Sequence, residues 1–150
     1  MKKVLFICSG NISRSPVAAC ILQKMLNDKN CTDVVVDSAG THNLFSEPYD
    51  SKMIDVAQRH GYTLSGVSKQ MNKEILTDAT LILAMDFSHY VKVQQLLPYP
   101  QWYKLDTFCD YCFGVDSIVE DPFCGSDELY ERVFQLIENG CQIIADKISA

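Results

Sequence analysis

The sequence has no long hydrophobic segment. Nowhere in its 150 residues does an apolar run approach the roughly 20 residues that a membrane-spanning helix needs. The apolar run after the opening Met-Lys-Lys reaches only Cys8, which is too short for the core of a signal peptide. We therefore expect a cytoplasmic protein that does not bind membranes.

Positive charge is also scarce. The chain carries 13 Lys and Arg residues against 19 Asp and Glu residues, a formal net charge of -6. Nucleic-acid binding depends on a Lys- and Arg-rich surface that displaces counterions, so we expect no nucleic-acid partner. If an acidic protein of this kind binds phosphate, it must concentrate its positive potential locally.

Cysteine and histidine are present without the spacing of a disulfide framework or a metal site. The seven cysteines are odd in number, which favours reduced thiols. Cys109 and Cys112 form a C-x-x-C pair, but a zinc site ordinarily needs two more ligands, so we expect ordinary packing. His42, His60 and His89 are expected at the surface, with His60 near a helix end. We predict no metal and no cofactor.

The hydrophobic pattern predicts one α/β domain over residues 1–150. Continuous apolar runs at residues 3–8, 34–36 and 81–84 are typical of parallel strands that are covered on both faces. Helical patterns lie between and after these runs, so we expect a parallel sheet sandwiched by helices. Such sheets bind ligands at the carboxyl ends of their strands, where Cys8 would lie.

Several helix boundaries can be predicted. Ser15 is expected as an N-cap, with the following proline as the first helical residue. A second helix covers residues 52–60 and ends at Gly61. Asp86 caps a third helix, which must end before Pro98. The last helix has the clearest apolar face, formed by Leu129, Val133, Leu136, Ile137, Ile144 and Ile148.

The segment from Cys8 to Pro16, Cys-Ser-Gly-Asn-Ile-Ser-Arg-Ser-Pro, carries the strongest chemical signal. Five residues between Cys8 and Arg14 are about enough for the chain to curl with its backbone N–H groups inward, as an anion nest beside a helix N-terminus. This positive field favours the thiolate, the attacking form of cysteine. Arg14 offers a planar fork for two phosphate oxygens. No Gly-Lys-Ser/Thr follows, so the loop is not a nucleotide P-loop.

Transfer of a phosphoryl group to Cys8 would also need a general acid, because an alkoxide or phenolate leaves poorly unless it is protonated. Asp121 is the leading candidate, since the proline after it favours an extended backbone and stiffens the loop. An Asp-Pro pair alone more often starts a turn. The loop after Cys8 is what gives Asp121 its catalytic interpretation.

Residues 8–16 resemble the signature of the low-molecular-weight protein tyrosine phosphatases, C-x-G-N-x-C-R-S-P. The resemblance continues in family order through residues 37–41, 60–70, 84–88 and 120–123. It implies an α/β three-layer sandwich with a four-stranded parallel sheet flanked by helices and a phosphate-binding loop after strand 1. It also implies hydrolysis of phosphotyrosine proteins and small aryl phosphates through a phosphocysteine, without metal.

The resemblance also implies roles for individual residues. Cys8 attacks phosphorus, and Asp121 protonates the leaving oxygen and then activates water. The phosphate oxygens are held by Arg14 and by the N–H groups of Ser9, Gly10, Asn11, Ile12, Ser13 and Arg14. A supporting hydrogen-bond network contains Asn11, Ser15 and Ser38. The substrate cleft is lined by Leu44, Phe45 and Phe123.

The chain departs from the family pattern at four positions. Ser13 stands where many relatives have a second loop cysteine, so oxidised Cys8 should lack that neighbouring thiol. Cys124 is the obvious alternative partner. Phe123 and Cys124 also replace two tyrosines that relatives can phosphorylate, and Gly66 replaces a network histidine of animal relatives.

Two other functions are considered beside the phosphatase. An arsenate reductase of the same fold also uses a C-x5-R loop, and Cys109 and Cys112 could serve as its redox partners. A phosphate-binding module without turnover would use the same loop for recognition only. For the phosphatase, we expect a monomer or a weak dimer.

Overall fold

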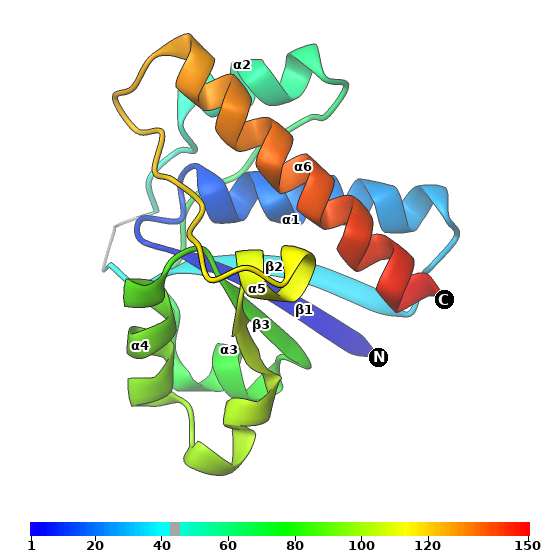
Figure 1. The fold of residues 1–150 in the computed structure, drawn as a ribbon, viewed down its shortest axis with the longest axis vertical. Coiled ribbons are helices and arrows are strands. Elements are labelled where there is room, and N and C mark those ends of the chain that lie inside the picture. Colours follow the sequence, from blue (N-terminus) through cyan, green and yellow to red (C-terminus); the bar gives the residue numbers. More distant parts are fainter. Residues whose placement is uncertain (43–45) are drawn as a thin grey trace.

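The computed structural model describes residues 1–42 and 46–150 (Figure 1). The strands are β1 (Lys2–Cys8), β2 (Val34–Gly40), β3 (Leu81–Ala84) and β4 (Leu105–Thr107). The helices are α1 (Arg14–Asp28), α2 (Ser51–Arg59), α3 (Lys73–Asp78), α4 (Phe87–Leu96), the 3-10 helix η1 (Tyr99–Lys104), α5 (Phe108–Phe113) and α6 (Asp127–Ser149).

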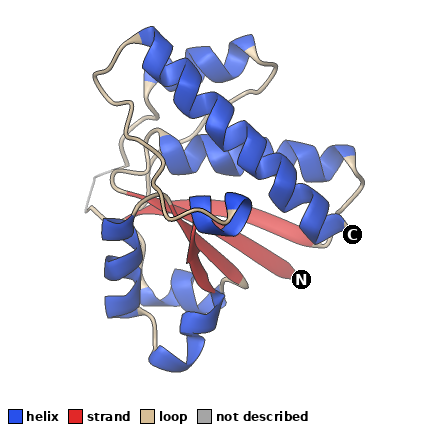
Figure 2. Ribbon diagram, in the orientation of Figure 1, coloured by secondary structure: helices blue, strands red, loops and turns tan. Residues whose placement is uncertain are grey.

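The strands form one parallel sheet in the order β2-β1-β3-β4, with helices on both faces (Figure 2). This confirms the predicted three-layer α/β fold. The register aligns the carboxyl ends of the strands: Cys8 lies opposite Gly40, and Ile7 lies opposite Ala84. Segments that follow different strands therefore meet at one edge of the sheet.

Alternate side chains of β1 enter two separate hydrophobic clusters. Val4, Phe6 and Cys8 pack in a cluster with α1, α2, α5 and α6. Leu5 and Ile7 pack in a second cluster with α3 and α4 on the opposite face. Figure 1 shows these two helical layers above and below the sheet. Because both faces are covered, β1 can be apolar at every position from Val4 to Cys8.

The start of α1 differs from the prediction. The helix begins at Arg14 with Ser13 as N-cap, two residues earlier than a cap at Ser15 would place it. Ser15 is a helical residue, and its hydroxyl hydrogen-bonds the Cys8 sulfur rather than the helix backbone. Pro16 still fits, because the first N–H groups of a helix have no partner within it.

The other predicted helix boundaries agree with the structure to within a residue or two, whereas β2 extends four residues beyond the predicted run at 34–36. Asp86 is the N-cap of α4 and accepts from the backbone of Ser88 and His89, as expected. Helix α2 ends at Arg59, and Gly61 follows with a positive φ of 87°. Across the described residues, no helix is both long enough and apolar enough to cross a membrane.

Candidate active site

The loop after β1 turns its carbonyl groups toward neighbouring backbone. The carbonyl oxygens of Cys8 and Ser9 accept hydrogen bonds from the N–H groups of the two residues after β2, both at 3.0 Å. The carbonyl of Ile12 accepts from the N–H of Asp50 at 2.8 Å. Within the described part of the chain, the N–H groups of residues 9–14 donate to no protein acceptor. These amides are available for an anion, as in a backbone nest.

A pocket of about 160 Å³ opens on this loop. It is lined by Cys8, Ser9, Gly10, Ile12, Ser13, Arg14, Asp121 and Phe123. The structure thus brings together the predicted nucleophile, arginine and general acid, together with most of the predicted phosphate-binding residues. Leu44 and Phe45, which were predicted to line the cleft, lie outside the described residues.

The Cys8 sulfur is held in a chain of buried hydrogen bonds. The Cys8 Sγ lies 2.9 Å from Ser15 Oγ, and the Asn11 side-chain amide donates to the same Ser15 oxygen at 2.9 Å. Since that oxygen accepts from Asn11, the Ser15 hydroxyl hydrogen is left to donate to the sulfur. A hydrogen bond to an ionised acceptor is stronger than a neutral one.

Asn11 lies behind the loop and connects it to the rest of the sheet edge. Its Nδ2 also donates to Ser38 Oγ at 2.9 Å, and its Oδ1 accepts from the Lys69 backbone N–H at 2.9 Å. With a φ of 54°, Asn11 adopts the left-handed conformation that its short polar side chain tolerates. The three residues predicted as a supporting network, Asn11, Ser15 and Ser38, are therefore joined by hydrogen bonds.

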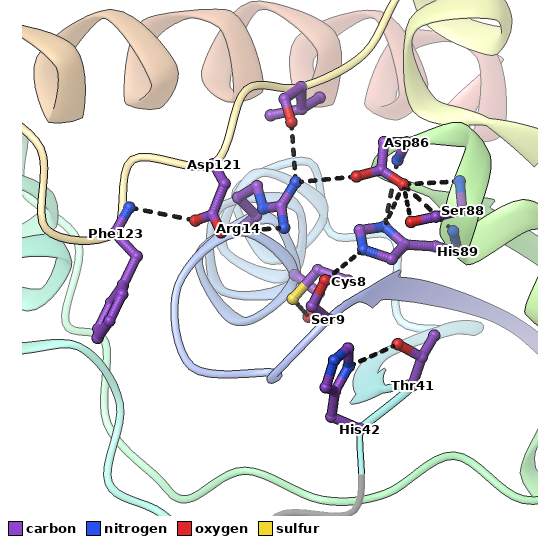
Figure 3. A network of polar contacts seen from close by, with 12 residues as sticks. Cys8, Ser9, Arg14, Thr41, His42, Asp86, Ser88, His89, Asp121 and Phe123 are labelled. Atoms are coloured by element: carbon purple, nitrogen blue, oxygen red, sulfur yellow. Dashed lines mark hydrogen bonds and ion pairs between the residues drawn. The ribbon is translucent and has the colours of Figure 1, made fainter.

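Arg14 is held between two carboxylates, Asp86 and Asp121, as Figure 3 shows. The Arg14 side chain is only 4% exposed, and its NH1 donates to the Val119 carbonyl oxygen at 3.0 Å. NH1 lies 3.6 Å from Asp86 Oδ2, and NH2 lies 3.7 Å from Asp121 Oδ2. These partners fix the guanidinium fork beside the pocket.

Asp121 and Phe123 lie on the segment between α5 and α6. The Asp121 side chain is 55% exposed, and its Oδ1 accepts from the Phe123 backbone N–H at 3.1 Å. Phe123 is 56% exposed and provides an aromatic wall of the pocket. An exposed carboxyl group beside Arg14 can reach a group bound in the pocket.

The first turn of α4 supplies two site residues that the sequence reasoning did not place there. Burial alone would raise the pKa of Asp86, but the hydrogen bonds from Ser88 and from the backbone of His89, together with the charge of Arg14, hold it below its ordinary value. The carboxylate therefore stays charged beside Arg14. His89 was predicted at the surface; this was wrong, because the residue is 1% exposed and its Nε2 lies 2.8 Å from Ser9 Oγ.

The profile of the family "Low molecular weight phosphotyrosine protein phosphatase" matches residues 3–150. The chain belongs to this family. A phosphatase of this family from Homo sapiens is 32% identical over 150 residues, which cover 97% of this chain and 95% of the relative. The membership identifies the chain as a protein tyrosine phosphatase, a phosphoric monoester hydrolase.

Solved structures of the family superpose on this phosphatase. The low molecular weight phosphotyrosine phosphatase 2 of Vibrio cholerae O395 matches with a TM-score of 0.92 and 28% identity, covering 99% of this chain and 97% of that one. The YwlE arginine phosphatase of Geobacillus stearothermophilus matches with a TM-score of 0.87 and 29% identity, covering 99% and 93%. The fold of the family thus carries phosphatases named for two different leaving groups.

The remaining cysteines of the phosphatase lie in different environments. Cys109 and Cys112 are buried in the core, as the packing interpretation predicts, and burial raises the pKa of Cys112 to about 12. Within the described residues, no cluster of potential ligands could hold a metal ion. Cys124 is exposed, with a positive φ of 63°, and follows Phe123 of the pocket.

Gly66, where animal relatives have a network histidine, takes no part in the hydrogen bonds of Asn11. It has a φ of 136°, and a Cβ there would lie 3.0 Å from the ring of Tyr49. A side chain at this position would be strained and crowded. Asn11 is supported instead by Ser38, Ser15 and the backbone of Lys69.

Proposed function

We propose that residues 1–150 form a single phosphatase domain that hydrolyses phosphotyrosine in proteins, and small aryl phosphates, through a phosphocysteine on Cys8. The Cys8 thiolate attacks phosphorus while the P–O bond to the leaving group breaks. Asp121 gives its proton to the leaving phenolate oxygen. Asp121 then takes a proton from water, which attacks the phosphocysteine and releases inorganic phosphate and the thiolate.

One observation carries this proposal. The amides of residues 9–14, which have no acceptor among the described residues, lie with the Arg14 guanidinium and the Cys8 sulfur around a single small pocket. Positive groups held in place before the reaction stabilise the charge on the equatorial phosphoryl oxygens without reorganisation. A module that only recognises phosphate has no need of Asp121 beside Arg14.

The pocket walls favour an aryl leaving group. Ile12 and Phe123 are apolar residues on the pocket lining, and an aromatic ring can pack against both. A guanidinium leaving group, as in phosphoarginine, would lose hydration against these walls, and the carboxylate on the pocket lining, Asp121, already pairs with Arg14. We therefore expect phosphotyrosine peptides to be hydrolysed faster than phosphoarginine peptides.

An arsenate reductase is supported less well. Such a reductase passes oxidation from the loop cysteine to further thiols, which must be reachable and able to ionise. Cys109 and Cys112 are 2% and 7% exposed, and burial raises the pKa of both thiols. Arsenate turnover that depends on thioredoxin would decide for the reductase.

The proposed setting is the cytoplasm, with the protein as a monomer or weak dimer and no nucleic-acid or membrane partner. The net charge of -6 and the free thiols support this setting. Sedimentation velocity at several protein concentrations measures the oligomeric state.

The decisive assay follows hydrolysis of p-nitrophenyl phosphate by the wild type, Cys8→Ser and Asp121→Ala. We expect Cys8→Ser to abolish turnover while phosphate binding is retained, because the serine hydroxyl is a much weaker nucleophile. Asp121→Ala should slow turnover of this substrate by roughly a hundredfold, because the water of the second step then lacks its general base. Full activity of Cys8→Ser would refute the proposal.

A further inference from the structure

His89 is a buried histidine with an unassigned role in the site. It lies in the first turn of α4, and its Nε2 lies 2.8 Å from the hydroxyl oxygen of Ser9, 80 residues away in the sequence. Figure 3 shows the ring directed at Ser9, next to Cys8. A buried polar side chain is costly unless it is hydrogen-bonded, so this contact needs a physical reason.

The hydrogen bonds of the imidazole identify its donor nitrogen. The backbone N–H of Asp86 donates to His89 Nδ1 at 3.2 Å, so Nδ1 is an acceptor. Burial lowers the pKa of His89 to about 4 against the opposing effect of the Asp86 carboxylate, so the ring is neutral near pH 7. A neutral ring carries one hydrogen, which must then be on Nε2. His89 therefore donates to Ser9 Oγ.

This assignment leaves the Ser9 hydroxyl hydrogen free. Its oxygen already accepts from His89, and among the described residues the hydroxyl has no second hydrogen-bond partner. Ser9 also belongs to the lining of the pocket beside Cys8. Because the Ser9 oxygen accepts from His89 on one side, the hydroxyl hydrogen must point in another direction. The pocket lies beside this hydroxyl.

We propose that the Ser9 hydroxyl is an additional ligand of the bound phosphate, and that His89 is the residue that positions it. The proposal rests on the phosphatase function and adds a side-chain donor to the backbone amides of the loop. The same turn of α4 also places Asp86 beside Arg14. Helix α4 thus holds both ends of the phosphate-binding loop, Ser9 through His89 and Arg14 through Asp86.

Two substitutions of His89 separate this role from helix capping. His89→Asn keeps a side-chain oxygen near the position of Nδ1 for the Asp86 N–H, but its amide is too short to reach Ser9. His89→Gln extends an amide donor toward the position of Nε2, and glutamine is itself a common capping-box residue. Glutamine should therefore restore part of what asparagine loses.

The test measures binding of inorganic phosphate by calorimetry to the wild type, Ser9→Ala, His89→Asn, His89→Gln and the double variant Ser9→Ala/His89→Asn. We expect Ser9→Ala and His89→Asn each to raise the Kd about tenfold, as for the loss of one hydrogen bond. The double variant should bind no more weakly than either single variant, because both changes remove one interaction. His89→Gln should bind more tightly than His89→Asn.

Other outcomes would overturn the inference. An unchanged Kd in Ser9→Ala would exclude the hydroxyl as a phosphate ligand, and independent, multiplying effects in the double variant would exclude the coupling. Lower thermal stability of His89→Asn with an unchanged Kd would leave His89 a purely structural residue. Because binding is measured without turnover, failure of the phosphatase function in the p-nitrophenyl phosphate assay would be recognised separately.

Discussion

Ser13 makes the chemistry of Cys8 unusual at the scale of single residues. Its hydroxyl is buried and has no hydrogen-bond partner in the described part of the chain. A serine cannot form a disulfide with an oxidised Cys8, so a sulfenic acid there lacks an immediate partner within the loop. The sulfenic acid is then exposed to further oxidation, which is irreversible for most proteins.

We therefore expect peroxide to inactivate the wild type largely irreversibly. Intact-mass analysis after peroxide should show added oxygen on Cys8 that a thiol reductant does not remove. The matched control is Ser13→Cys, which should instead form a disulfide with Cys8 and recover activity after reduction. A recoverable internal disulfide in the wild type, for example with Cys124, would contradict this expectation.

Gly40 allows the end of β2 to lie directly against the phosphate-binding loop. A Cβ at this position would lie 2.7 Å from the carbonyl oxygen of Ser9 and 3.0 Å from the backbone nitrogen of Asn11. Both are backbone atoms of the loop, so they cannot move aside without displacing the loop itself. Gly40→Ala should therefore displace the loop and lower kcat/KM for p-nitrophenyl phosphate by at least about tenfold, consistent with the sensitivity of catalysis to small misplacements.

Gly140 provides the control for this substitution. It lies in α6, where a Cβ would come within 2.3 Å of the Phe108 ring in α5, away from the pocket residues. Gly140→Ala should cost about 1–3 kcal/mol of unfolding free energy through overpacking, with kcat/KM retained in the folded fraction. If Gly40→Ala lowers only stability and leaves kcat/KM unchanged, the close packing at Gly40 does not position the loop.

At the scale of elements, the buried histidine of α4 connects stability to pH. The groups that face His89 are Asp86, Arg14, Lys92 and Asp121, and burial is the largest influence on its pKa. The folded protein keeps this ring neutral down to about pH 4, whereas an unfolded chain protonates it near its ordinary value of 6.5. Between these values the unfolded state binds more protons, so stability falls as the pH falls.

His89 should therefore contribute stability that is complete above about pH 6.5 and is lost toward pH 4. The loss amounts to at most about 3 kcal/mol for the shift of its pKa to about 4. Urea unfolding of the wild type and His89→Asn at pH 7 and pH 4.5 measures it. The wild type should lose more stability than the variant over this interval, and equal losses would remove His89 as the cause.

The sequence predicts some elements better than others for physical reasons. Strands β1 and β3 are fully covered, so their continuous apolar runs mark them within about one residue. Strand β4 has three residues and α3 and α5 have six each, which is too short for a periodic pattern to show. Those elements are formed by tertiary contacts.

The same distinction applies to the site. Cys8 and Arg14 are close in sequence, so their loop carries a local signal, and Asp121 could be added through the family resemblance. The contacts of Asp86 with Arg14 and of His89 with Ser9 span much longer separations in the chain. Asp86 was predicted only as a helix cap, since no local pattern shows what its second carboxylate oxygen contacts.

At the scale of the whole molecule, the site is assembled where the strands end. The phosphate-binding loop follows β1, the backbone that supports its carbonyls follows β2, and the Asp86–His89 turn follows β3. Asp121 is added from the segment between α5 and α6. Because these segments come from separate parts of the chain, the complete site exists only in the folded protein.

The most direct test of the account is to trap the phosphocysteine. Asp121→Ala should accumulate it with p-nitrophenyl phosphate, because p-nitrophenolate leaves without a general acid whereas the water of the second step still needs a base. Rapid acid quenching and peptide mapping by mass spectrometry should place one phosphate on Cys8. Phosphate on any other residue, or continued turnover of the substrate by Cys8→Ala, would contradict the account.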